Sequence, residues 1–472
     1  MNKERICFMS AVEMAEKVAT QEISSLEITE TIIERIEKIN PIINAYCTTT
    51  FDIARDMARK ADIKVKNNEN IGKINGIPIS IKDLMFTKGI RTTMGSKLFE
   101  HLIPDVDAVD VARLKNAGGV ILGKTNTPEF GYAGVTHNKI FGVTKNPWNL
   151  ERTSGGSSGG AGAACASGIS PLALGSDGGG SIRHPSCFCG IYGIKPSFGR
   201  VPIFPNEGIL GYSISHHGPM TRFVEDAALM LDVIKGPHEG DQFSLPAENI
   251  SYSEGIKDIP NKLKIAFSID LGYAKVLDPD VERVVRDSIE KLEKEFGWDV
   301  EESKVKLRPP IMAFNTIYTA IYGYELGPKL TKWREEMDPD LIKLIEAGLS
   351  YPSTAFMKAI SQRKEFYEKI YRFMKNYDFL ITPTTAIPAF GLGMMFPSEI
   401  NGIGVSPTGW QPFTFPFNLT GQPAATVPCG WSRDDLPIGI QIIGKRFDDL
   451  GVLKVSKAFQ DIVPWQKKHP NF

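Results

Sequence analysis

The sequence predicts an α/β protein, because stretches with helical periodicity alternate with short apolar strands along its 472 residues. Apolar residues recur at helical spacing over residues 10–40, and Asp52–Lys66 is expected to form a second helix. The period then changes at Ile77–Ile81, where isoleucines alternate with Pro78 and Ser80 as they would in a strand. The alternation predicts the fold class but does not fix the order of the strands.

The remaining elements follow from the same two periodicities. We expect Pro41 to end the first helix. Further helices are expected at residues 107–117, 160–166, 224–235 and 281–296 and within 310–375, and strands at 119–122, 171–174, 263–268 and 379–381. Turn-forming residues predict loops over 124–134, 144–154 and 216–219.

Composition excludes several classes of function. Lys and Arg (54) balance Asp and Glu (55), so no basic field favours nucleic acid, and no basic amphipathic stretch favours a membrane. The N-terminal segment MNKERICFMSAVEMAEKV lacks the apolar core of a signal peptide, and the six cysteines are scattered, which favours reduced thiols and a cytoplasmic location. Cys187 and Cys189 have the wrong spacing for a zinc knuckle, so we expect no metal and no cofactor.

The stretch from Thr153 to Arg183 is the most informative part of the chain. It reads TSGGSSGGAGAACASGISPLALGSDGGGSIR. A flexible linker is one interpretation, but the helix-forming run at 161–166 and the apolar run at 169–174 favour a packed site with two serines on glycine turns. The helix and strand expected between Ser157 and Ser181 can return the chain, so that both turns meet at one end. The glycines before Ser181 could expose successive N–H groups, as an oxyanion hole requires.

Two other motifs match known sequence patterns but lack the structural context that those patterns require. Gly118–Thr125 matches the Walker A pattern, but the expected strand fills the interval where a phosphate-binding loop would have to lie. Gly155–Gly159 matches the nucleophile elbow of Ser-His-Asp hydrolases, but no buried strand is expected just before it. A Ser-His-Asp triad therefore stays a minor alternative. Lys82 closes the strand at 77–81, where it could either snorkel to the surface or serve a buried site.

Several motifs, in order, resemble the amidase signature family. They are GIPISIKD, ILGKTNTPEFG, GGSSGG, GSDGGGSIRHPS with FCGIYGIKP, HGPMTRFVEDAALML, and FPFNLTGQPAATVPCGW with LPIGIQIIG. The resemblance implies one large α/β domain with a mixed central β-sheet flanked by helices on both faces. Within residues 1–472 it implies an N-terminal helical region (1–70), a signature core (71–235), a variable and mostly helical region (236–375) and a C-terminal part of the core (376–472).

The resemblance also assigns roles to individual residues. It makes Ser181 the nucleophile, Ser157 a bridging serine held by a cis Gly156–Ser157 peptide, and Lys82 the base. It places the oxyanion hole at the N–H groups of Gly178, Gly179, Gly180 and Ser181, and gives supporting roles to Ser158, Asp177 and Arg183. Gly178 departs from the family, which usually carries a larger residue there. A lysine is a base only when neutral, so burial must lower its pKa from about 10.4.

The expected substrate is a small-molecule amide, cleaved by an acylamide amidohydrolase through an acyl-enzyme. The candidate pocket residues are Phe130, Gly131, Trp410 and Gln411. Gln411 stands where the glutaminase subunits of tRNA-dependent amidotransferases carry an acid, which favours a free-standing amidase and leaves the glutaminase as the alternative. No nucleic acid or membrane partner is expected, and a homodimer is left open. Aromatic residues within 310–375 are expected mainly in the core, and some could line the pocket.

Overall fold

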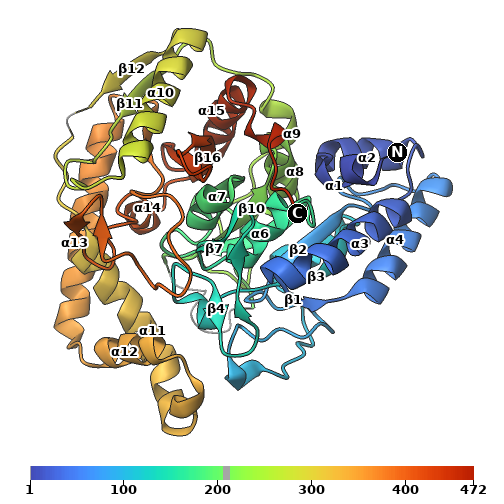
Figure 1. Cartoon of the computed structure of the whole chain (residues 1–472), viewed down its shortest axis with the longest axis horizontal. Coiled ribbons are helices and arrows are strands. Elements are labelled where there is room, and N and C mark those ends of the chain that lie inside the picture. Colours follow the sequence, from blue (N-terminus) through green and yellow to red (C-terminus); the bar gives the residue numbers. More distant parts are fainter. Residues whose placement is uncertain (1, 206–212, 304) are drawn as a thin grey trace.

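A mixed sheet of eleven strands runs through the part of the chain that the computed structural model describes, which is residues 2–205, 213–303 and 305–472 (Figure 1). The strand order is β1-β3-β2-β8-β10-β9-β16-β17-β13-β11-β12. The strands of this sheet are β1 (Tyr46–Thr49), β2 (Pro78–Lys82), β3 (Val120–Thr125), β8 (Leu172–Asp177), β9 (Tyr192–Lys195), β10 (His216–Thr221), β11 (Lys264–Phe267), β12 (Asp299–Glu302), β13 (Phe379–Pro383), β16 (Ala424–Trp431) and β17 (Pro437–Ile443).

The sheet contains both kinds of pairing. β2 is parallel to β3 and to β8, and β11 is parallel to β12 and β13, whereas the strands between β8 and β13 are antiparallel. Small two-stranded sheets pair β4 (His137–Asn138) with β5 (Gly142–Val143), β6 (Lys145–Asn146) with β7 (Asn149–Thr153), and β14 (Glu399–Ile400) with β15 (Ile403–Gly404). The expected mixed sheet is therefore confirmed.

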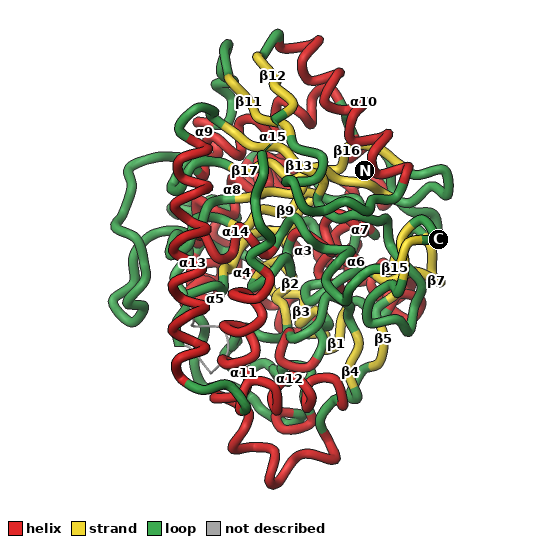
Figure 2. Tube along the Cα trace, turned by 90° about the vertical axis from the view of Figure 1, so that its left-hand side faces the viewer, coloured by secondary structure: helices red, strands yellow, loops and turns green. Residues whose placement is uncertain are grey.

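Helices cover both faces of the sheet (Figure 2). In β9, a side chain at Gly193 would collide with Ser186 of α7, whereas Tyr192 points to Ser456 of α15, as the alternation of side chains in a strand requires. The helices are α1 (Lys3–Phe8), α2 (Ala11–Ala19), α3 (Ser25–Ile43), α4 (Phe51–Lys66), α5 (Val109–Asn116), α6 (Gly159–Ala166), α7 (Arg183–Cys189), α8 (Val224–Ile234), α9 (Tyr252–Gly255), α10 (Pro279–Phe296), α11 (Ile311–Trp333), α12 (Pro339–Leu349), α13 (Ser353–Met374), α14 (Phe415–Thr420) and α15 (Asp449–Ile462). None of the helices in the described ranges is long and apolar enough to cross a membrane.

The helices α11, α12 and α13 form a separate layer at one side of the molecule (Figure 1). α11 packs against both of the others, and its inner side carries buried aromatic and aliphatic residues. This layer lies beside the edge of the sheet at which the two serine turns meet, so it can supply side chains to the site.

Most expected elements are confirmed, and four expectations are wrong. The helix expected over 10–40 is two helices, because Ser24 caps α3 by accepting a hydrogen bond from Glu27 N–H. Pro41 lies inside α3, which ends instead at Asn44 in a left-handed conformation. Residues 149–153 form the strand β7 rather than a loop.

The fourth wrong expectation is the loop at His216–Pro219. These residues belong to β10, which pairs with β8 on one side and β9 on the other. Gly and Pro are poor strand formers, so here the pairing and burial of the whole segment prevail over local propensity.

Candidate active site

Three segments meet at one edge of the sheet. Lys82 ends β2, and Asp177 ends β8, the adjacent parallel strand, so the chain leaves both strands at the same edge. Ser157 lies in the turn before α6, and Ser158 N–H donates to the carbonyl oxygen of Ser181 at 3.2 Å. The helix and strand between the serines therefore return the chain, as expected. The peptide between Gly156 and Ser157 is cis, also as expected.

Lys82 is fully buried and is surrounded by hydroxyl groups. Its Nζ lies 2.6 Å from Ser157 Oγ, 2.9 Å from Ser158 Oγ and 3.0 Å from Ser176 Oγ. None of these contacts is to a carboxylate. Burial lowers the pKa of Lys82 well below its usual value, and the charge of Asp177 opposes this only in part. The neutral amine is therefore favoured.

The direction of each hydrogen bond follows from how many donors and acceptors the neutral lysine and its serine neighbours have. A neutral amine has two N–H donors and one lone pair. Ser158 Oγ donates its own hydrogen to the carbonyl oxygen of Ser176 at 3.2 Å, so it must accept from Lys82. If Ser176 Oγ takes the second N–H, the lone pair is left for the hydroxyl of Ser157. The shortest contact is then the one through which a proton can pass to the lysine.

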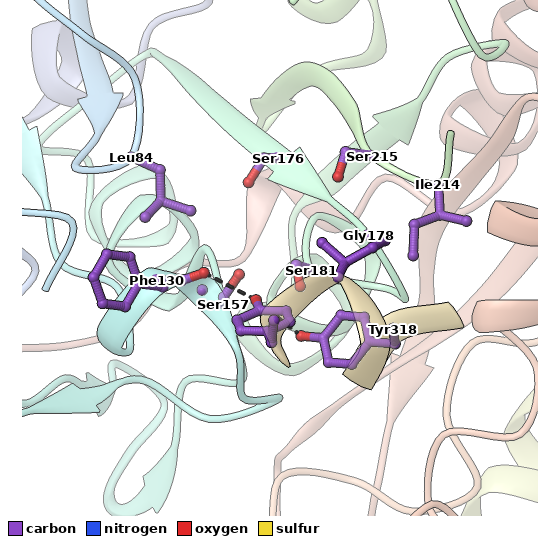
Figure 3. A pocket seen from close by; sticks show the side chains of 12 residues that line it. Leu84, Phe130, Ser157, Ser176, Gly178, Ser181, Ile214, Ser215 and Tyr318 are labelled. Atoms are coloured by element: carbon purple, nitrogen blue, oxygen red, sulfur yellow. Dashed lines mark hydrogen bonds between the residues drawn. The ribbon is translucent and has the colours of Figure 1, made fainter. Parts of the chain in front are cut away.

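Ser157 and Ser181 line the same small cavity, which has a free volume of about 30 Å³ (Figure 3). Among the described residues of the wall, six are apolar or aromatic, four are serines and two are glycines, and none is charged or a histidine. Its residues are Leu84, Phe130, Gly131, Ser157, Ser176, Gly178, Ser181, Ile214, Ser215, Tyr318, Ile321 and Tyr322. The absence of histidine from this wall weakens the Ser-His-Asp alternative.

A buried ion pair holds the loop that carries Ser181. Arg183 donates to both carboxylate oxygens of Asp177, at 2.9 Å each, and neither side chain is exposed. Asn418 Nδ2 donates to the same carboxylate at 2.8 Å. Burial alone would raise the pKa of Asp177, but the Arg183 guanidinium and the Asn418 amide hold it far below its usual range. The carboxylate is thus a fixed anchor for the turn.

The N–H groups of the glycine turn are of two kinds. Gly180 N–H donates to Asp177 Oδ1 at 2.8 Å. This N–H group was expected in the oxyanion hole, but here it is used within the loop. The N–H groups of Gly178, Gly179 and Ser181 form no hydrogen bond to any described residue. These three remain as free donors beside the cavity.

A second loop closes the cavity opposite the glycine turn. Phe130 has a left-handed backbone conformation (φ 51°), and a side chain at Gly131 would come within 3.2 Å of Ser157 Oγ. Helix α11 holds this loop, because Tyr322 Oη donates to the carbonyl oxygen of Phe130 at 3.0 Å and Tyr318 Oη donates to that of Tyr132 at 2.9 Å.

The four candidate pocket residues divide into two pairs. Phe130 and Gly131 line the cavity. Trp410 and Gln411 do not, and Trp410 is only 1% exposed because it packs against the rings of His184, Phe188 and Phe390. Sequence reasoning missed Leu84, Ser176, Ile214, Ser215 and Ile321. Of these, only Ser176 had a signal, since it lies inside the serine motif.

Comparison with known proteins identifies the class of this site. The Amidase family model matches residues 27–453. The acylamidase of Rhodococcus erythropolis is 38% identical over 480 residues, which cover 100% of this chain and 98% of that protein. The A subunit of glutamyl-tRNA(Gln) amidotransferase from Sulfurihydrogenibium sp. (strain YO3AOP1) is 36% identical, with 98% of each chain covered. A bacterial aryl acylamidase has the same fold, with a TM-score of 0.90, 30% identity, and coverage of 98% of this chain and 97% of that one.

The fold is that of amide hydrolases, and the similarity to an acylamidase supports amide hydrolysis. The chain belongs to the amidase signature family, as the match across most of its length shows.

Proposed function

We propose that this protein is a free-standing amidase that cleaves simple acyl or aryl amides through an acyl-enzyme on Ser181. The observation that carries the proposal is the 2.6 Å contact between Lys82 Nζ and Ser157 Oγ, next to a cavity that Ser157 shares with Ser181. A serine hydroxyl becomes a good nucleophile only when a base removes its proton. A buried lysine without a carboxylate partner fits that base.

In the proposed acylation step, the oxygen of Ser181 attacks the amide carbon. Its proton passes to Ser157, and the proton of Ser157 passes to Lys82. The negative oxygen of the tetrahedral intermediate accepts hydrogen bonds from the N–H groups of Gly178, Gly179 and Ser181. When the C–N bond breaks, the same relay returns a proton from Lys82 to the leaving nitrogen, and the amine departs.

Deacylation repeats the steps with water as the nucleophile. Lys82 again receives a proton through Ser157, water adds to the ester carbon, and Ser181 leaves with its proton restored. The products are a carboxylic acid and an amine or ammonia. All the groups in this scheme belong to the chain, so it calls on no cofactor. Asp177 and Arg183 hold the turn, and Ser158 orients the lysine.

The chemistry of the cavity wall favours neutral substrates over glutamine. Glutamine carries an ammonium and a carboxylate, and burying either without a partner is costly. None of the described residues on the cavity wall is charged, and the hydroxyls of Tyr318 and Tyr322 already bind backbone carbonyls. The alternative, a glutaminase subunit of an amidotransferase complex, is kept open by the similarity to amidotransferase A subunits.

The test combines covalent labelling with a substrate panel. A fluorophosphonate should label Ser181 in the wild-type protein and in Ser215→Ala, but not in Ser181→Ala, which should stay folded and inactive. Label on another residue would contradict the mechanism. Release of ammonia from glutamine only in the presence of partner proteins, with no cleavage of aryl or alkyl amides, would favour the glutaminase.

We also propose that residues 1–472 form one domain with the four regions expected from the sequence, and that the protein acts in the cytoplasm. Limited proteolysis tests the first point, since a stable fragment ending near residue 235 or 375 would contradict it. Fractionation of the source cells tests the second.

A further inference from the structure

We propose a second ligand site, for a phosphorylated planar ring such as a nucleoside monophosphate, between α13 and the residues that follow β17. The site is a cavity of about 420 Å³, within the range of roughly 300–1,000 Å³ that is typical of small-molecule sites. Its lining residues are Tyr367, Tyr371, Met374, Lys375, Gln422, Lys445, Arg446 and Phe447, none of which lines the catalytic cavity. α13 faces the reader in Figure 2.

Three cations from two segments surround this cavity. Lys375 follows the last turn of α13, and Lys445 and Arg446 follow β17. Lys445 lies 3.4 Å from Asp378, but Lys375 and Arg446 form no ion pair with any described residue. No acidic residue is among the described residues that line the cavity. Because Lys375 and Arg446 have no described counter-ion, the cavity favours an anion, and the planar guanidinium of Arg446 suits a phosphate.

Aromatic rings lie between the cations. Tyr367 and Tyr371 are one helical turn apart on α13, with ring planes 14° apart and centroids at 6.5 Å. Phe447 is 49% exposed, and the guanidinium of Arg446 lies 4.8 Å from the centre of its ring. Aromatic side chains beside cations form a surface on which a planar ring can stack while its charged group is bound.

A buried amide forms part of the cavity wall. Gln422 is only 4% exposed and lines the cavity. Its Nε2 donates to the carbonyl oxygen of Gly444 at 2.8 Å, whereas its Oε1 accepts no hydrogen bond from the described part of the chain. Buried polar oxygens are normally paired. This oxygen has almost no accessible surface, so the choice of a planar ring with a phosphate rests on the cations and the aromatic rings.

A neighbouring cavity of about 300 Å³ extends the positive strip. The two cavities share Tyr367 and Arg446, and the second adds Arg363 and Lys364 from the same face of α13. The described residues that line it also include no acid. The strip therefore continues for three turns of the helix, long enough for both the ring and the phosphate of a nucleotide.

Isothermal titration of the full-length protein with AMP at low salt tests the site. We expect saturable binding that weakens about tenfold in Arg446→Glu and about fivefold in Tyr371→Ala, since the two variants remove charge and stacking separately. Adenosine and inorganic phosphate should each bind more weakly than AMP. The matched control is Arg372→Glu, because Arg372 lies on the same helix, lines neither cavity and is 76% exposed.

Three results would overturn the proposal: no saturable binding of AMP, equal binding to the wild type and Arg446→Glu, or binding of phosphate alone as tight as that of AMP. If Arg446→Glu fails to fold, Lys375→Glu at the exposed end of α13 serves instead, with the same expected loss. Amide hydrolysis should stay within about twofold of wild type in these variants, since no lining residue is shared with the catalytic cavity.

Discussion

A carboxylate placed beside Lys82 should switch off the proposed base at neutral pH. Ser176 Oγ lies 3.0 Å from Lys82 Nζ, so a Ser176→Asp substitution would bring a negative charge within about 4 Å of the amine. Two opposite unit charges at that distance attract by about 4 kcal/mol at an effective dielectric constant of about 20. Since one pKa unit is worth about 1.4 kcal/mol, the pKa of Lys82 should rise by about three units.

Under the proposed mechanism, a higher pKa of Lys82 lowers the activity at neutral pH. Lys82 acts as a base only when it is unprotonated, so the acidic limb of the kcat/KM profile should move to higher pH by about three units, and activity below that limb should fall about 1,000-fold. The profile is measured with a neutral anilide whose charge does not change with pH. The control is Ser176→Asn, which has a similar size but no charge and should leave the limb in place. If the limb stays at the wild-type pH in a folded Ser176→Asp protein, Lys82 is not the base.

Three further predictions test the supports of the site. Tyr322→Phe leaves the carbonyl oxygen of Phe130 without a donor, so urea unfolding should show a loss of about 1–3 kcal/mol, and KM should rise as the loop loosens. Arg183→Met leaves the charge of Asp177 buried and unpaired and should cost about 3–5 kcal/mol near pH 7. Because the folded-state pKa of Asp177 is depressed, this difference should be present above about pH 4 and shrink as the pH falls, which unfolding curves across pH can check. In Gly178→Val, the new Cβ would have one atom within 4 Å, at 3.9 Å, so the side chain should enter the cavity and lower kcat/KM for bulky acyl groups more than for small ones.

Each of these predictions has a result that would contradict it. An unchanged KM and stability in Tyr322→Phe would mean that α11 does not hold the loop. A pH-independent loss in Arg183→Met would mean that the loss does not come from the charge of Asp177. An equal loss for all acyl groups in Gly178→Val would point to a damaged turn rather than a filled cavity.

The segments that carry the proposed catalytic residues were predictable because their sequence signals are local. The change of period at Ile77–Ile81 located β2 with Lys82 at its end, and the glycine-flanked serines located the two turns. The strand expected at 119–122 is part of β3, which occupies the interval where a phosphate-binding loop would have to lie.

What could not be predicted depends on contacts between distant segments. His216 and Pro219 carry a loop-like sequence, yet the neighbouring strands β8 and β9 hold them in β10. Trp410 looked like a pocket residue from its place in the chain, but its ring fills the core beside Phe188. Ile214 and Ile321 reach the cavity only because two segments about a hundred residues apart pack together. The periodicity of a single sequence indicates local structure and does not show which distant segments contact each other.

The small free volume of the catalytic cavity has a consequence for turnover. About 30 Å³ leaves room for only a few water-sized groups, far less than the roughly 300–1,000 Å³ of a typical small-molecule site, so we expect part of the wall to move when an amide binds. Tyr318 and Tyr322 tie α11 to the loop at Phe130, so we expect these two walls to open as one gate. Substrate admission would then have its own rate, set by the gate and separate from bond cleavage. Stopped-flow binding tests this: a rate that levels off with rising substrate concentration supports the gate, and one that stays proportional to concentration refutes it.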